Sequence, residues 1–243
     1  MKKALALLLA VLLCFFASTA FPEDDWDDFD FDEEDMEFEE DEEDDGSLRF
    51  DGSYTANDWA GEDAIETFES GDYVYMLNET RDGAITMSYR RNDIDVVVPD
   101  KLDQYPVVGI GEHTFESHDK IESVTLPEGI QMIGNMAFTR CSSLKSIVIP
   151  EGVTLLDQMC FGACDNLVEV RVPSTVETVG NFAFLACRKL QEISFGNNLQ
   201  SIGQGAFQLC QELKKITIPK DSVEIGTDAF TDCPSDLEIL DSI

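Results

Sequence analysis

Residues 187–210 decide the fold, and they read CRKLQEISFGNNLQSIGQGAFQLC. The same arrangement of cysteine, spaced apolar residues and phenylalanine returns every 23 residues along the second half of the chain. Phenylalanine marks this period most clearly, and it stands at Phe115, Phe138, Phe161, Phe184, Phe207 and Phe230. A fixed period of roughly 20 to 50 residues is the signature of a repeat protein whose units stack on one another.

Three further columns keep the same register. Proline stands at 127, 150, 173 and 219, with Gly196 in the fourth place. Cysteine stands at 141, 164, 187, 210 and 233, with His118 in the first place. Glycine stands at 111, 134, 180, 203 and 226, with Asp157 as the exception. Agreement at so many positions predicts a solenoid of stacked 23-residue units.

Each unit has a local structure that its residues indicate. In 144–150, Ile147 and Ile149 alternate with outward-facing residues, as in a strand, and Pro150 ends that strand because it has no N–H to donate. A second short extended piece follows, and then Phe and Cys stand three residues apart, the spacing of a helical or 3₁₀ turn. We therefore predict a parallel β-sheet of 23-residue repeats that are joined by short helical or 3₁₀ turns.

The region before the repeats carries a hairpin signal. Residues 73–77 and 84–89 are rich in strand-forming residues, and the turn signal Asp82-Gly83 lies between them. We predict that residues 47–93 form an N-terminal cap with a β-hairpin, and that 94–243 form the solenoid of about six repeats. The first unit is longer, with 28 residues from Pro99 to Pro127, and we expect the extra residues to form a loop around 100–107.

The N-terminus is typical of a secretory signal peptide at residues 1–20. Lys2 and Lys3 precede an apolar stretch at 4–17, and small residues follow at 18–20. The apolar stretch is too short for a membrane-spanning helix, and no later segment is long enough. We expect a secreted or extracellular protein, possible association with the cell surface, and no membrane span in the mature form.

Acidic residues dominate the segment that follows. Asp and Glu make up 18 of the 23 residues at 23–45, and the whole chain carries a formal net charge of −34. We expect residues 21–46 to be a disordered acidic tail, because charge repulsion is large and little apolar surface is available. The charge argues against a nucleic-acid partner, since phosphate binding requires clustered Lys and Arg.

The repeat resembles that of a known family. Cys187, Leu190, Ile193 and Phe195, followed by Ile202-Gly203 and Ala206-Phe207, are similar to the BspA-like, treponemal-type leucine-rich repeat. The resemblance covers roughly residues 94–240 and implies a leucine-rich-repeat solenoid. It further implies secreted or surface proteins with roles in adhesion and host contact, no catalytic residues, no cofactor and no enzymatic activity.

The cysteine and histidine positions allow more than one interpretation. We favour buried, small apolar side chains for the cysteine column and Cys160, with a disulfide or a metal site as the alternatives. Metal spacing of the Cys-x-x-Cys kind is absent. The two histidines, His113 and His118, both lie in the first unit, and we expect a structural or surface role for each.

Outward positions of the predicted sheet are the candidates for partner binding, since solenoids usually bind through an extended face. They are Ser123, Thr125, Ser146, Val148, Glu169, Arg171, Glu192, Ser194, Lys215 and Thr217. We expect a monomer that binds a protein or glycan, for example on a host surface or in the matrix, as an adhesin does. The alternative is that the acidic tail sequesters divalent cations or basic peptides and the solenoid is its carrier.

Overall fold

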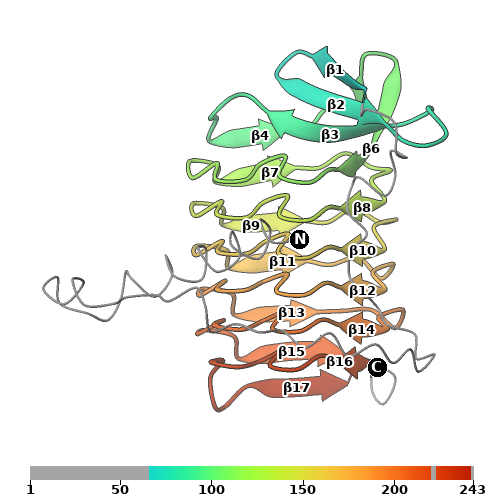
Figure 1. Ribbon diagram of the computed structural model, residues 1–243. Helices are drawn as coiled ribbons and strands as arrows, with labels where there is room; N and C mark the ends of the chain where they lie inside the picture. Colours follow the sequence, from blue (N-terminus) through green and yellow to red (C-terminus); the bar gives the residue numbers. More distant parts are fainter. Residues whose placement is uncertain (1–65, 220–222, 242–243) are drawn as a thin grey trace, which may run out of the picture. The chain divides into compact units, whose positions relative to one another are not determined.

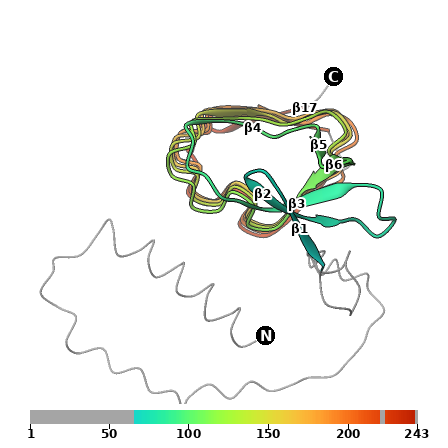
Figure 2. The same cartoon turned by 90° about the horizontal axis from the view of Figure 1, so that it is seen from above.

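A computed structural model describes residues 66–219 and 223–241 of the chain (Figure 1). The predicted signal peptide at 1–20 and the acidic tail at 21–46 lie outside these residues. The predicted cap at 47–93 lies only partly within them. Within the described residues, the repeats form stacked coils that superpose closely when viewed along the stack (Figure 2).

One strand from each coil forms a seven-stranded sheet. The strands pair in parallel, and in every strand but the last the central residue is buried between two outward-facing neighbours, as the alternating sequence pattern predicts. The sheet runs in this order: β4 (Asp95–Val97), β7 (Ser123–Thr125), β9 (Ser146–Val148), β11 (Glu169–Arg171), β13 (Glu192–Ser194), β15 (Lys215–Ile218) and β17 (Glu238–Asp241).

The second extended piece of each coil forms a sheet of its own. These short strands also pair in parallel from coil to coil. The stack of coils therefore has two sheets, whereas the sequence suggested one. The two sheets enclose the core between them. The strands are β6 (Tyr105–Ile110), β8 (Met132–Ile133), β10 (Leu155–Leu156), β12 (Thr178–Val179), β14 (Ser201–Ile202) and β16 (Glu224–Ile225).

The predicted hairpin is confirmed and extends this second sheet. β2 (Tyr73–Leu77) pairs antiparallel with β3 (Ala84–Tyr89), and β3 pairs in parallel with β6. A further strand that we did not predict, β1 (Thr67–Ser70), pairs with β2. The expected loop around 100–107 is instead a small antiparallel pairing of β5 (Lys101–Leu102) with the start of β6.

The predicted helical turns are wrong, because the described residues contain no helix. The Cys141 N–H does donate to the Phe138 carbonyl oxygen at 3.1 Å, as the three-residue spacing suggested. The Phe138 N–H, however, donates to the Cys160 carbonyl of the next coil at 2.8 Å. An α-helix would use both N–H groups internally. Alternate N–H groups here hold neighbouring coils together, and the segment is a run of β-turns.

Two columns of these turns have positive φ values, including Met136 at 53° and Arg140 at 62°. Such values are uncommon for residues other than glycine. These positive φ values recur at each coil because the backbone must reverse twice within a short segment. Its N–H groups must at the same time donate hydrogen bonds to the next coil. The two columns are 113, 136, 159, 182, 205 and 228, and 117, 140, 163, 186, 209 and 232.

Stacked phenylalanine rings form the centre of the core. The ring centroids of Phe115 and Phe138 lie 5.0 Å apart with an interplanar angle of 11°, and the stacking continues to Phe230. In the cap, the Tyr89 ring lies 5.4 Å from the Phe115 ring. Tyr73 contacts both. The hairpin therefore continues the aromatic stack and covers the first coil, as a cap must.

Candidate interaction surface

The outer face of the seven-stranded sheet presents two straight rows of side chains. Register pairs Ser123 with Ser146, Ser146 with Glu169, and Glu192 with Lys215. The central residue between the rows is buried in every strand except β17, where Ile239 is 52% exposed, and the flanking side chains face outward. The first row is Asp95, Ser123, Ser146, Glu169, Glu192, Lys215 and Glu238; the second is Val97, Thr125, Val148, Arg171, Ser194, Thr217 and Leu240.

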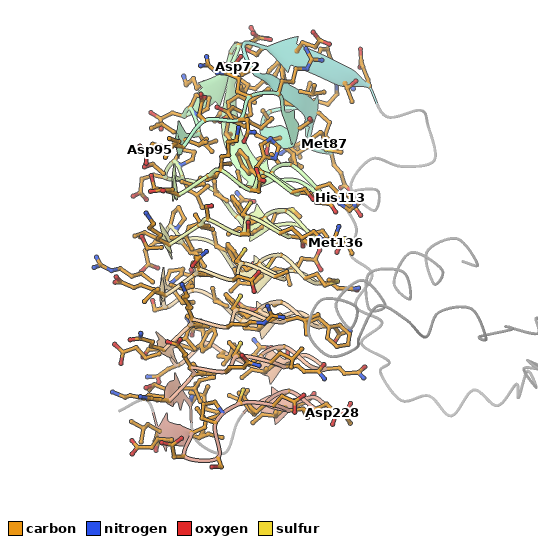
Figure 3. The ribbon with its side chains drawn as sticks, turned by 90° about the vertical axis from the view of Figure 1, so that its left-hand side faces the viewer. Asp72, Met87, Asp95, His113, Met136 and Asp228 are labelled. Atoms are coloured by element: carbon orange, nitrogen blue, oxygen red, sulfur yellow. The ribbon has the colours of Figure 1, made fainter. Side chains whose placement is uncertain are left out.

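All ten residues predicted for partner binding lie in these two rows. Each is exposed or half-buried, and the structure brings them onto one continuous face. Figure 3 shows Asp95 on the side of the stack opposite to the turn residues His113, Met136 and Asp228. The rows also include four residues at the ends of the sheet that the prediction did not include. These are Asp95, Val97, Glu238 and Leu240.

The two rows differ in chemistry. The first is mainly acidic, with Lys215 as its basic member. The second has exposed apolar side chains, since Val97 and Val148 are 70% and 57% exposed. Arg171 lies in that row between Val148 and Ser194. Its Nε atom forms an ion pair with the Glu169 carboxylate at 2.7 Å. Ion pairs this exposed add little stability, so these charges remain available to a partner.

A shallow groove of about 650 Å³ runs along the C-terminal half of this face. Its walls come from four successive coils. The first residue of each strand contributes, and so does the residue just before β11, β13 and β15 and the residue two positions before β17. The alternation pattern alone did not indicate these preceding residues. The lining residues are Val168, Glu169, Gln191, Glu192, Lys214, Lys215, Asp236 and Glu238.

The cysteine column has a structural role. The thiol of Cys141 donates to the Phe115 carbonyl oxygen at 3.1 Å, and that of Cys187 donates to Phe161 at 3.1 Å. The same contact recurs at 164, 210 and 233. Burial raises the pKa of the Cys141 thiol to about 12. The six cysteines of the described residues are free thiols, so the disulfide alternative is wrong for this structure.

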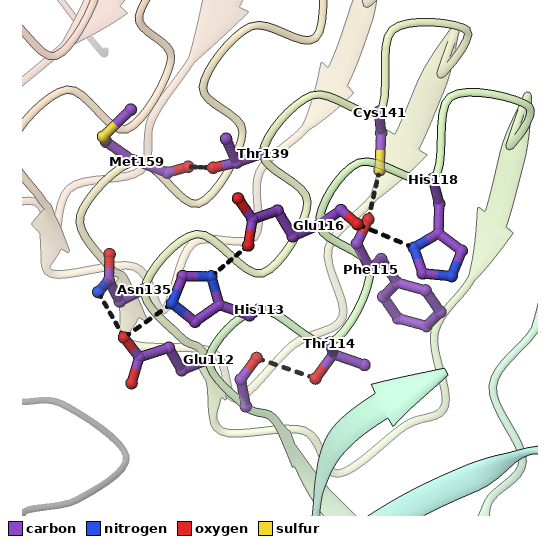
Figure 4. A network of polar contacts seen from close by, with 11 residues as sticks. Glu112, His113, Thr114, Phe115, Glu116, His118, Asn135, Thr139, Cys141 and Met159 are labelled. Atoms are coloured by element: carbon purple, nitrogen blue, oxygen red, sulfur yellow. Dashed lines mark hydrogen bonds and ion pairs between the residues drawn. The ribbon is translucent and has the colours of Figure 1, made fainter. Parts of the chain in front are cut away.

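The two histidines lie in a polar network in the first coil (Figure 4). The His113 ring contacts Glu116 at 2.6 Å and Glu112 at 3.2 Å, and Glu112 also accepts a hydrogen bond from Asn135. The hydrogen bond to Glu112 raises the pKa of His113, and the same bond lowers the pKa of Glu112. The ring of His118 contacts the carbonyl oxygens of Glu116 and Tyr89.

Comparison with known proteins identifies the repeat. The profile of the "BspA type leucine rich repeat region" matches residues 108–236 in six copies, more than half of the chain. The chain belongs to the BspA-type leucine-rich-repeat family. Among curated protein sequences, none matches it.

Solved structures of other proteins resemble this fold. The leucine-rich repeat protein TpLRR of T. pallidum is 26% identical, with a TM-score of 0.59; the match covers 71% of this chain and 92% of TpLRR. The pneumococcal vaccine antigen PcpA is 18% identical with a TM-score of 0.56, over 72% of this chain and 50% of PcpA. A leucine rich cell surface protein of Faecalibacterium prausnitzii is 20% identical with a TM-score of 0.33. The match covers 74% of this chain and 77% of that protein.

The BspA-type scaffold offers no metal centre in its described part. Within 66–219 and 223–241, no group of three or more His, Cys, Asp or Glu side chains is placed to hold a metal ion. The same residues contain no helix that is long and apolar enough to cross a membrane.

Proposed function

We propose that this protein is a secreted or cell-surface, non-enzymatic interaction protein that binds a protein or glycan through the outer face of the seven-stranded sheet. The observation that supports the proposal is the pair of exposed side-chain rows across seven strands, with a groove of about 650 Å³ along them. Solenoids commonly bind through such extended faces. The expectation of a secreted or cell-surface protein rests on the signal-peptide pattern at residues 1–20.

The chemistry of the rows favours a partner with both polar and apolar contacts. Val97 and Val148 provide apolar area, while Arg171 and Lys215 provide donors that suit carboxylates, sulfates or sugar hydroxyls. The neighbouring Glu169 and Glu192 provide acceptors. The mixed face matches the ordinary composition of transient interfaces, which are about as polar as the rest of a protein surface.

The test uses two double variants of the full-length protein. Val148→Asp with Arg171→Glu changes the proposed face. Thr178→Glu with Gln200→Glu changes a half-buried and an exposed position on and beside the other sheet. Binding to immobilised extracellular-matrix extracts and to a panel of surface glycans is then measured for each. We expect a ligand retained by the wild type and the control, and an affinity at least about tenfold weaker for the sheet-face variant.

A truncated form that begins at Gly46, and therefore lacks the acidic segment, tests the alternative function. If the sheet-face variant binds as the wild type does, and only forms that contain residues 21–45 retain material that salt removes, the sheet-face proposal is wrong. The acidic segment would then be the binding element, as the sequestration hypothesis holds.

A further inference from the structure

Charges of alternating sign lie in one straight column of the sheet face. The strand register places Lys215 directly between Glu192 of the coil before it and Glu238 of the coil after it. Each of these three side chains is exposed, and each is the first residue of its strand, which is β13, β15 or β17. This charged column therefore reads acid, base, acid along the axis of the stack.

The charges of the column point into the groove and not at one another. Opposite charges that face each other on neighbouring strands commonly attract. Within 66–219 and 223–241, however, no ion pair joins Lys215 to either glutamate. Elsewhere on the same side of the stack Glu122 and Lys145, also one coil apart, do form an ion pair at 2.5 Å. All three side chains of the column line the groove of about 650 Å³, so a partner in the groove would meet them directly.

The spacing of the charged column matches a helix. Neighbouring strands lie about 4.8 Å apart, so the two glutamates of the column lie about 9.6 Å apart along the stack. Residues i, i+4 and i+7 share one side of an α-helix, and they lie at about 0, 6 and 10.5 Å along its axis. Alternate residues of an extended chain would lie at about 0, 6.7 and 13.4 Å. The helix is closer at both intervals, so it can place one side chain against each charge of the column.

The remaining lining of the groove suits a polypeptide better than a sugar. None of the residues that line it is aromatic, so a sugar ring would have no aromatic side chain to stack on. Val168 is 38% exposed and supplies apolar area in the lining, while Lys214 adds a second positive charge beside Lys215. Amphipathic helices bind in grooves through residues that recur at i, i+3, i+4 and i+7.

We propose that the groove binds an amphipathic helix of another protein, in which an acidic residue at i+4 stands between basic residues at i and i+7. The two basic residues face Glu192 and Glu238, and the acidic residue faces Lys215. The inference rests on the sheet-face function proposed above, and it names the class of partner and the part of the face that the partner uses.

The first test uses two alanine-based helical peptides of equal composition and net charge, matched in helix content by circular dichroism. One carries Lys, Glu and Lys at i, i+4 and i+7, and the other carries Lys, Lys and Glu at these positions. We expect the first peptide to bind the full-length protein at least about tenfold more tightly at low ionic strength, because the second turns two attractions into repulsions. Equal affinities overturn the proposal. They would also be the result if the acidic segment at 23–45 bound the peptides through net charge alone.

The second test exchanges two charges of the protein. Lys215→Glu with Glu238→Lys keeps the net charge and makes the column read acid, acid, base at exposed positions. We expect this variant to reverse the preference, so that the second peptide binds more tightly. Lys120→Glu with Glu128→Lys is the matched control, since it exchanges exposed charges outside the groove and should keep the wild-type preference. An unchanged preference in the groove variant contradicts the proposal.

The helix proposal and the sheet-face function fail separately. If Val148→Asp with Arg171→Glu loses the matrix or glycan ligand while the two peptides bind the wild type alike, the helix proposal is wrong and the sheet-face function stands. If that variant retains the ligand, the sheet-face function itself is wrong. A glycan that the groove variant fails to bind, with neither peptide preferred by the wild type, would assign the groove to a glycan and overturn the helix proposal.

Discussion

The Nε2 atom of His118 lies 3.0 Å from the carbonyl oxygen of Tyr89, the last residue of β3. In every later coil a cysteine thiol makes the equivalent contact, as Cys141 does with the Phe115 carbonyl. The histidine thus occupies the first place of the cysteine column and joins the solenoid to its cap. A longer side chain serves there because the partner belongs to a hairpin strand rather than to another coil.

Removing this ring should weaken the junction of the cap with the first coil. We expect His118→Ala to lower the free energy of unfolding by about 1–3 kcal/mol, because the Tyr89 carbonyl loses a donor and the ring contacts with Phe115 are lost. Urea denaturation followed by circular dichroism measures the effect. Lys120→Ala, at an exposed position of the same coil, is the control and should change stability by less than about 0.5 kcal/mol. Equal effects of the two variants would contradict the junction role.

A pH dependence should arise from His113 and Glu112. The pKa of His113 is raised above its ordinary value of 6.5 by the hydrogen bond to Glu112, so its contribution is present below 6.5 and is lost as the pH rises through the raised pKa. The pKa of Glu112 is lowered below 4.5 by His113, so its contribution is present above 4.5 and is lost as the pH falls through the lowered pKa. The pair therefore stabilises the protein most between pH 4.5 and 6.5.

The variant His113→Gln tests this dependence. The His113 side chain is 42% exposed, so solvent screening limits the difference from the wild type to under about 1 kcal/mol. That difference should be largest near pH 5 to 6 and should decline above the raised pKa of His113. Urea denaturation at a series of pH values measures it. A difference that stays constant from pH 5 to 9 would show that His113 acts only through packing.

The columns of the repeat could be predicted from sequence, and the turns could not. Phe138 and Ile147 recur with a fixed period and chemistry, so the register, the inward residues and the two outward rows follow from alternation. The positive-φ column that contains Met136 instead holds His, Met, Phe, Gly and Asp in different coils. No residue preference marks those turns. Hydrogen bonds to the next coil fix them, and such bonds are visible only in the stack.

The candidate surface was predictable to the same extent. The ten outward residues share one face because strand alternation determines it. The groove depends on side chains from four coils, including Val168 and Asp236, whose position before each strand gives no signal of its own. The strand β1 was not predicted because its own sequence is short and carries little signal. Its pairing with β2 makes it a strand.

The thiols should react in order of exposure. Burial raises the pKa of the Cys233 thiol to about 11, while Cys187 is fully buried and its pKa is raised well above the ordinary value of 9.0. The thiolate is the reactive form, and its fraction at neutral pH is very small for both. Iodoacetamide labelling of the folded protein, read by mass spectrometry, should modify Cys233 before Cys187 and the other four buried cysteines. Denatured protein, in which all react alike, is the control, and equal rates in the folded protein would contradict the burial of the column.

Glycine at position 111 should be essential to the junction of the cap with the solenoid. The Gly111 N–H donates to the Thr86 carbonyl oxygen at 2.8 Å, and a Cβ at this position would lie 2.2 Å from that same oxygen. Because backbone atoms form the obstacle, β3 would have to move away from β6. We therefore expect Gly111→Ala to lower the free energy of unfolding by more than about 2 kcal/mol.

Gly71→Ala is the matched control in the turn between β1 and β2. Its φ is 57°, and nothing lies within 4 Å of an added Cβ, so the change should cost only the backbone strain of about 1–2 kcal/mol. Hydrogen exchange distinguishes the two, because only Gly111→Ala should increase exchange at the amides that join β3 to β6. Equal destabilisation by both variants, without faster exchange there, would show that the cap tolerates separation of these strands.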